Sequence, residues 1–232
     1  MTALIVIALS LLAGWTVNVM ADALPTAQSP ASCWRQPWDA LSRLLRGKLL
    51  PGDRTHAWRT LLVWGAALIA GWLAFRRFGM SAEALVVAVY AWFFLAVAVI
   101  DLEHRRVLNR MLLAALPFAL AASLLLHNPP PLSAVAGTAL GFGVFLLLAL
   151  VRPGGMGMGD VKLAGLIGLM TGLDGVILAM TVGILAGGLA ALALLASRRF
   201  DRKATMAYAP YLALGAWVAL YFGADLWRAY LA

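Results

Sequence analysis

Long apolar runs alternate with short polar connections along almost the whole chain. A helix needs about 20 apolar residues to cross a bilayer, and eight runs approach that length. They cover residues 3–21, 59–75, 84–100, 111–126, 132–150, 161–173, 175–196 and 206–223. The pattern predicts an all-α fold, a polytopic membrane helical bundle of about eight transmembrane helices. The run at 161–173 is short, so we expect it to be partly re-entrant or to continue into the turn before it.

Composition agrees with this pattern. The 232 residues are 63% hydrophobic and 12% charged, whereas soluble domains are about half apolar. We expect a single membrane-embedded domain over 1–232, with a short loop at 22–58. The net charge is +8, but the basic residues lie between apolar runs and form no dense patch. The expected surroundings are therefore the lipid bilayer, with no nucleic-acid partner.

The basic residues also predict an orientation. Fifteen of the 18 Lys and Arg residues fall on one side of the predicted helices, and only Arg76, Arg77 and Arg228 fall on the other. Cytoplasmic loops carry the excess of Lys and Arg, so the N-terminus is expected outside and the number of spans even. The first run resembles a secretory signal, but Met1 to Ala8 contains no basic residue, so we expect it to remain as a span.

Small residues recur at a four-residue spacing that lets helix backbones approach closely in lipid. The pairs are Gly137 and Gly141, Gly168 and Gly172, and Gly183 and Gly187. Helix packing is the interpretation that we prefer for them.

Three of the ten acidic residues are candidates for chemistry. Asp101 directly follows an apolar run, at a helix C-terminus, where the helix dipole disfavours a carboxylate. Asp160 ends the sequence Gly157-Met158-Gly159-Asp160, just before another apolar run. Acids at membrane depth are costly and usually functional. The orientation places Asp101 and Asp160 at one membrane face, whereas Glu103 is expected to be solvated.

Two neighbouring carboxylates share a proton, so one acts as a base and the other as an acid. Such a pair can activate water against a peptide carbonyl, as in aspartic proteases. Gly157 and Gly159 lack a Cβ, which would let an extended substrate approach. Sequence spacing alone leaves a structural alternative open, in which Asp160 caps its helix and Asp101 pairs with Arg105. Lys162 either pairs with Asp160 or marks the membrane interface, which is the role we favour.

Four blocks of sequence carry a more specific signal. The first is Gly14-Trp15-Thr16-Val17-Asn18-Val19, closing at Pro25, and the second runs from Ile100-Asp101-Leu102-Glu103-His104 to Asn109. The third is Gly157-Met158-Gly159-Asp160-Val161-Lys162-Leu163, and the last is Tyr208-Ala209-Pro210-Tyr211-Leu212-Ala213-Leu214-Gly215. In this order they resemble the type IV prepilin peptidases, membrane aspartic proteases that remove the short basic leader of type 4 pilins and type II secretion pseudopilins.

The resemblance implies that Asp101 and Asp160 are the catalytic pair. It implies cleavage after a glycine, at the cytoplasmic face of the bacterial inner membrane, without a metal or a covalent intermediate. The substrates would be prepilins or pseudopilins, and Glu103 is the nearest candidate for contacting a basic leader. The residues expected to bind substrate or support the site are Gly157, Gly159, Glu103, Lys162, Asn109, Asn18 and Pro210.

The chain also departs from the fuller members of that family. Those carry two cysteine pairs in the first cytoplasmic loop, thought to hold zinc, and methylate the new N-terminus with S-adenosylmethionine. Here that loop holds only Cys33, so we expect no zinc site, and methyl transfer with S-adenosylmethionine stays open. Leu108 replaces a proline and Ala209 a glycine, and neither change removes a group needed for hydrolysis.

Two other readings of the acidic pair remain. A proton-coupled transporter or channel would use Asp101 and Asp160 as a relay. However, such relays normally lie near mid-membrane in repeated halves, and the chain shows no repeat. The second alternative is a presenilin-like protease of the same glycine-x-glycine-aspartate type. The blocks around Asn18, Asn109 and Pro210 favour a prepilin peptidase over this alternative.

Overall fold

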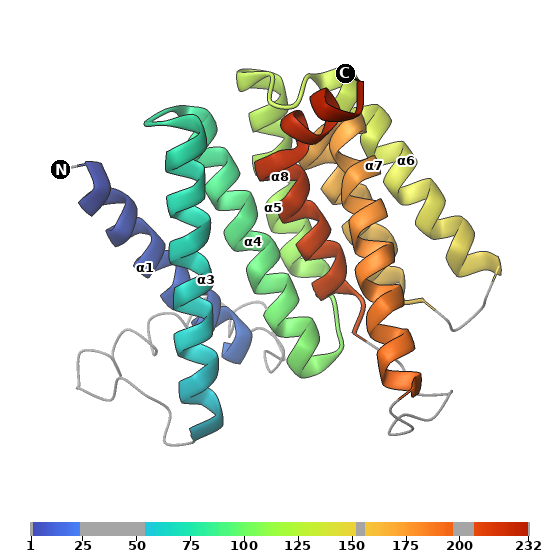
Figure 1. Cartoon of the computed structure of the whole chain (residues 1–232), viewed down its shortest axis with the longest axis horizontal. Helices are drawn as coiled ribbons and strands as arrows, with labels where there is room; N and C mark the ends of the chain where they lie inside the picture. The colour runs from blue at the N-terminus through green and yellow to red at the C-terminus, as the bar shows by residue number, and fades with distance from the viewer. Residues whose placement is uncertain (1, 24–53, 152–155, 197–206, 232) are drawn as a thin grey trace. The chain divides into compact units, whose positions relative to one another are not determined.

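The structure is a computed structural model, which describes residues 2–23, 54–151, 156–196 and 207–231. These residues form helices joined by short connections, which confirms the all-α class (Figure 1). The seven helices within them are α1 (Thr2–Ala23), α3 (Arg54–Phe78), α4 (Ala82–His104), α5 (Asn109–Leu126), α6 (Pro131–Val151), α7 (Met158–Ala196) and α8 (Ala209–Leu231). Each contains a stretch long and apolar enough to cross a membrane. The chain is therefore an integral membrane protein.

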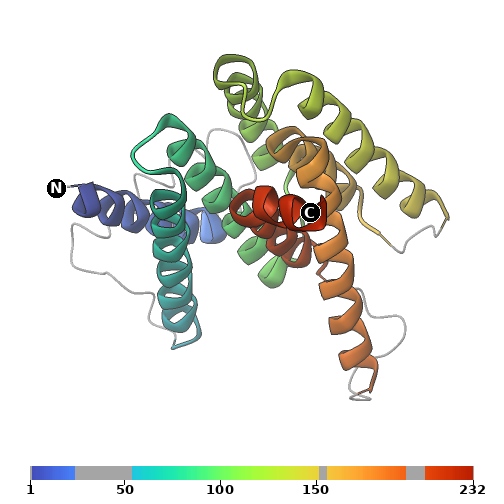
Figure 2. The same cartoon turned by 45° about the horizontal axis from the view of Figure 1, so that its top comes forward.

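Helix α7 contains two of the predicted spans. Its 39 residues would measure about 58 Å if straight, well beyond the roughly 30 Å of a bilayer core. It is instead two helical segments that meet at Gly172, whose φ of 75° favours glycine. The N–H of Leu173, at this break, donates to Ser133 Oγ of α6 at 2.9 Å. The runs at 161–173 and 175–196 thus form two helical segments, and α7 changes direction between them (Figure 2).

The ends of the helices adjust two predicted boundaries. Helix α1 continues to Ala23 and α3 begins at Arg54, so both ends of the predicted loop at 22–58 lie in helices. Helix α8 continues to Leu231, beyond the predicted end at 223. Cys33 lies outside the described residues.

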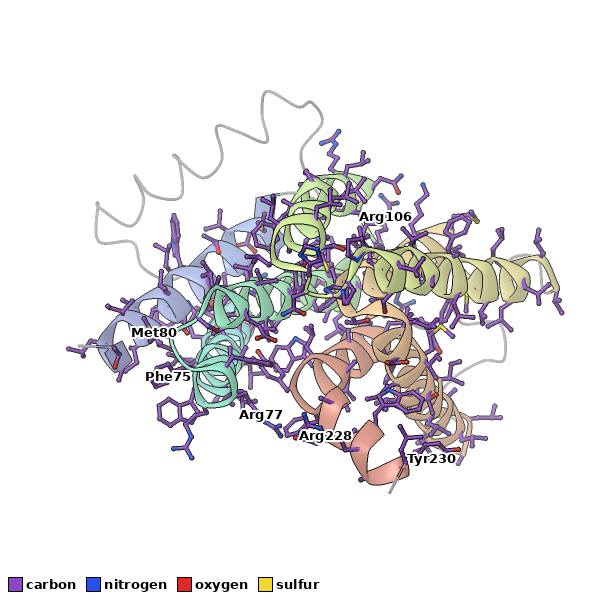
Figure 3. The ribbon with its side chains drawn as sticks, turned by 90° about the horizontal axis from the view of Figure 1, so that it is seen from above. Phe75, Arg77, Met80, Arg106, Arg228 and Tyr230 are labelled. Carbon is purple, nitrogen blue, oxygen red and sulfur yellow. The ribbon has the colours of Figure 1, made fainter. Side chains whose placement is uncertain are left out.

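The chain divides into two compact units, Met1–Ala96 and Val97–Ala232. In the first, α1 packs against α3, and Asp22 forms an ion pair with Arg59 at 2.7 Å. The indole N–H of Trp92 in α4 donates to the Ala67 carbonyl of α3 at 3.1 Å. Figure 3 labels Phe75, in the last turn of α3, and Met80, in the connection from α3 to α4. A single domain over the whole chain stays a prediction.

The second unit is held together by glycine contacts between helices. A Cβ on Gly137 of α6 would lie 2.7 Å from the Gly168 carbonyl oxygen of α7, and one on Gly141 would overlap the Ala164 carbonyl. A Cβ on Gly183 would approach Leu212 of α8 to 3.2 Å. The prediction that the spaced glycines serve helix packing is therefore confirmed, and the tight α6–α7–α8 packing positions the starts of α7 and α8.

Candidate active site

Asp101 lies in the last turn of α4, in the second unit, and is only 4% exposed. Its Oδ2 accepts a hydrogen bond from the backbone N–H of Ala209 at 3.1 Å. Ala209 is the first residue of α8, so this N–H has no partner within its own helix. The positive end of the α8 dipole therefore faces a carboxylate that the C-terminal end of α4 disfavours. Among the described residues no ion pair joins Asp101 to Arg105, so that alternative is not supported.

Asp160 lies in the first turn of α7 and is partly buried. The backbone of Gly157 hydrogen-bonds its carboxylate, while the Asp160 N–H donates to the Gly157 carbonyl at 3.0 Å. Asp160 is the third residue of α7, so the second bond is an ordinary bond of the first turn, and the first is the half of a capping box in which the acid holds the N-cap backbone. Asp160 therefore does help to cap its own helix.

The two carboxylates are close enough for their charges to interact. Asp101 comes from the end of α4, Asp160 from the start of α7, and the backbone that holds Asp101 from the start of α8. The structure thus brings together the pair that the sequence placed at one membrane face. Capping and pairing coexist at Asp160, because its backbone partner and its charged neighbour are different groups.

Tyr208 is a site residue that the sequence reasoning did not single out. Its carbonyl accepts the N–H of Tyr211 at 3.1 Å, so it occupies the N-cap position of α8. Its ring lies 6.0 Å from that of Phe145 of α6, and a Cβ on Gly187 would meet it at 2.8 Å. Burial raises the pKa of Tyr208 to about 12, and the negative charge of Asp160 adds to this rise. Tyr208 is thus a protonated phenol at neutral pH, close to Asp160.

The signal for Tyr208 was present in the sequence. It opens the fourth block and directly precedes Ala209, whose N–H holds Asp101. Nothing in the sequence alone indicated that this block approaches the other two.

The two glycines before Asp160 differ in their surroundings. A Cβ on Gly159 would lie 2.8 Å from Val107 Cβ and 3.2 Å from the Val107 carbonyl oxygen, in the connection between α4 and α5. Gly159 therefore has a packing reason to be glycine that the sequence reasoning missed. Gly157 is exposed, and a Cβ there would only touch Asp160 Oδ2 at 3.4 Å. A role in admitting substrate stays a prediction for both.

Lys162 and Asn109 are joined directly. Lys162 Nζ donates to Asn109 Oδ1 at 3.0 Å, which links the first turn of α7 to the first residue of α5. No carboxylate in the part of the chain that the structure describes forms an ion pair with Lys162, so it does not pair with Asp160. The favoured reading, a cation at the membrane interface, agrees with its exposed position.

The remaining predicted residues lie at different places. Pro210 is the second residue of α8, where the missing N–H costs no helical bond. Glu103 is exposed in the last turn of α4. Asn18 lies in α1, in the first unit, where it is buried and its Nδ2 donates to the Gly14 carbonyl at 2.9 Å. Within the described ranges no group of three or more His, Cys, Asp or Glu side chains could hold a metal ion.

The fold and the site define a polytopic helical membrane protein with two acidic side chains whose charges interact, where α4 ends and α7 and α8 begin. Residues 88–192, which include Asp101 and Asp160, match the type IV leader peptidase family. The segment 88–192 therefore belongs to this family. No solved structure shows a significant match to the chain.

Curated relatives agree with this assignment. A prepilin leader peptidase/N-methyltransferase of Bacillus subtilis is 30% identical over 155 residues, which cover 67% of this chain and 62% of the relative. The protein of the same name from Pseudomonas aeruginosa is 31% identical over 173 residues, 71% of this chain and 58% of the relative. The chain thus spans about three fifths of the length of these relatives.

Proposed function

We propose that this protein is a membrane aspartic endopeptidase that cleaves the leader from type 4 prepilins or type II secretion pseudopilins after a glycine. The observation that carries the proposal is the approach of Asp101 to Asp160 inside the segment that matches the leader peptidase family. The same family match favours proteolysis over the proton-coupled transporter that the acidic pair alone allowed.

The mechanism follows from two carboxyl groups that share one proton. The ionised carboxylate removes a proton from a water molecule as the water oxygen attacks the peptide carbonyl carbon. The protonated partner donates to the carbonyl oxygen, which forms a neutral tetrahedral intermediate. When the C–N bond breaks, the protonated carboxyl group donates its proton to the leaving amine, and the other carboxylate accepts a hydroxyl proton from the intermediate, so the pair again holds one proton.

The backbone holds both groups for this work. The Ala209 N–H fixes one oxygen of Asp101, and the Gly157 backbone fixes the Asp160 carboxylate. Orientation by fixed backbone dipoles costs no reorganisation during the reaction. The free oxygens of the pair are then available to water and to the substrate carbonyl.

The substrate class is supported by the names of the relatives, which are prepilin leader peptidases. The location at the bacterial inner membrane, with the site facing the cytoplasm, is supported by the distribution of basic residues. Arg105, Arg106, Arg110 and Lys162 lie on the helix ends or connections next to the pair. The positive-inside rule places such a face in the cytoplasm.

The proposed proteolysis uses side chains and water alone, without zinc or another cofactor. S-adenosylmethionine enters the proposal only for a second step, methylation of the new N-terminus. That step is supported by the N-methyltransferase part of the relatives' names. Methylation is separable from proteolysis, because S-adenosylmethionine supplies the methyl group and neither carboxyl group of the acidic pair takes part in its donation.

Incubation of the purified chain in detergent with a full-length prepilin tests the proposal, with the product read by intact mass. We expect the mass to fall by that of the leader, ending at its glycine. A matched prepilin with a bulky residue in place of that glycine should stay uncut. Addition of S-adenosylmethionine reports methylation as one added methyl group. An unchanged substrate, together with proton flux in liposomes holding the chain, would refute the peptidase and favour the transporter.

A further inference from the structure

A groove in the second unit lies next to the acidic pair but belongs to neither carboxylate. It has a volume of about 380 Å³ and is lined by α5, α6 and the first segment of α7. Its floor is apolar and buried, formed by residues such as Leu112, Leu166 and Leu169. Its rim is exposed, with Leu113 at 67% and Phe142 at 38% exposed. The groove therefore offers apolar surface that the described residues leave uncovered.

One end of this groove is polar and cationic. Lys162 and Asn109 line it there, and their hydrogen bond accounts for one of the three donors of the ammonium group. The other two donors face no carboxylate in an ion pair within the described residues. Arg105 and Arg106 are exposed in the connection just before α5, and Figure 3 labels Arg106. Glu103 is the acidic residue of the same stretch, so the balance of charge near this end is positive.

The shape of the groove suits an extended chain that lies along α5. Asn109 to Leu116 spans about 10 Å along that helix. A hydrocarbon chain is far thinner than a helix, which with its side chains is about 10–12 Å wide. The apolar floor between α5 and α7 therefore offers contacts along the length of an acyl chain.

We propose that this groove binds an anionic phospholipid of the bilayer, with its phosphate at Lys162 and Asn109 and one acyl chain along α5, α6 and α7. A cation at the membrane interface with an apolar channel beneath it is the pattern that recognises acidic headgroups between transmembrane helices. Because Lys162 stands two residues after Asp160, the lipid would sit against the same first turn of α7 that carries the proposed catalytic group. The lipid site does not depend on the peptidase activity.

The experiment reads lipid contact from inside the groove as the difference in quenching between a variant and the parent chain, because the nine Trp residues of the parent also fluoresce. The variant Phe142→Trp places an indole on the rim of the groove. Its control is Leu125→Trp, because Leu125 of α5 lies outside the groove and is 78% exposed. Each variant is placed in nanodiscs of mixed phosphatidylglycerol and phosphatidylcholine at a fixed ratio. Bromine, which quenches indole fluorescence, is carried on the acyl chains of one lipid or of the other.

We expect about fivefold greater occupancy by phosphatidylglycerol beside the indole of the Phe142→Trp variant, the enrichment typical of one cation near an anionic surface. The preference should disappear when Lys162→Gln is added and persist with Arg228→Gln, which removes a cation at the end of α8. The indole of the Leu125→Trp control should be quenched equally by both lipids.

Two results would overturn the proposal directly. They are equal quenching of the Phe142→Trp variant by the two lipids, and a lipid preference that survives Lys162→Gln. Loss of quenching on addition of a prepilin would assign the groove to the substrate, which would also overturn it.

Discussion

The end of α4 and the start of α7 each hold an acidic residue, but the two carboxylates are stabilised in different ways. Asp160 stands at a helix N-terminus, where the dipole and the Gly157 backbone both favour a carboxylate. Asp101 stands at a helix C-terminus, where local physics opposes it, and its partner is Ala209, 108 residues away. Asp160 therefore has a local structural reason to be present, while Asp101 depends on tertiary structure.

This difference teaches where function can be inferred from position. A carboxylate that caps its own helix needs no further explanation, so Asp160 alone is weak evidence for catalysis. Asp101 is stronger evidence. A neutral residue at the end of α4 would cost less free energy than a carboxylate, yet the chain has a carboxylate there and the N-terminus of α8 holds it. The approach of the two is what makes the cap of α7 a candidate catalytic group.

Replacing either acid by its amide should have the largest effect. Asp101→Asn and Asp160→Asn each remove one proton-transfer group, so leader cleavage should slow by about 10²–10⁴-fold. The amide oxygens still accept the backbone N–H groups, so the fold should persist. Initial rates of prepilin cleavage measure the change. Glu83→Gln, at an exposed acid in the first turn of the same helix as Asp101, is the matched control and should stay within a factor of a few of the parent rate.

Replacing the acids by alanine should separate their structural roles. Asp101→Ala leaves the N–H of the fully buried Ala209 without a partner, which costs about 1–3 kcal/mol of unfolding free energy. Asp160→Ala removes a side chain from the start of α7, which costs about 1 kcal/mol. Unfolding in graded denaturing detergent measures both. A larger loss for Asp160→Ala would contradict the contrast between the two regions.

The sequence predicted the helices and the candidate acids but not the contacts that hold the acids. Apolar runs report helices directly, so each predicted span overlaps a helix, including the pair that α7 joins across Gly172. The C-terminal position of Asp101 indicated that something else must hold it. The sequence could not show that Ala209 holds Asp101, because the packing of α6, α7 and α8 decides where the start of α8 lies. The same reason hid Tyr208 and Val107.

Gly159→Ala should cost less than Asp101→Ala, about 1–2 kcal/mol, in the lower part of the range for overpacking. The added Cβ would meet Val107, which lies in a connection that can shift. Gly157→Ala is the matched control, because its Cβ makes only an ordinary contact with Asp160. Unfolding midpoints measure the two changes. Equal destabilisation by both would show that Val107 is not the cause.

Asn109→Ala should have the smallest effect on stability. It removes an exposed hydrogen bond with Lys162, worth about 0.5 kcal/mol at the low end of the usual range. Lys162→Ala should cost the same, and the double variant should cost no more than either. A double-mutant cycle on unfolding free energies tests this. Additive losses would mean that the two residues act through separate contacts.

The central claim is that Asp101 and Asp160 act as one unit in peptide hydrolysis. Cleavage rates of the parent, Asp101→Asn, Asp160→Asn and the double variant on one prepilin test it most directly. Residues that act as a unit are strongly non-additive, so the double variant should retain the same residual rate as either single variant. Losses that multiply, or a single variant that cleaves at the parent rate, would contradict the claim.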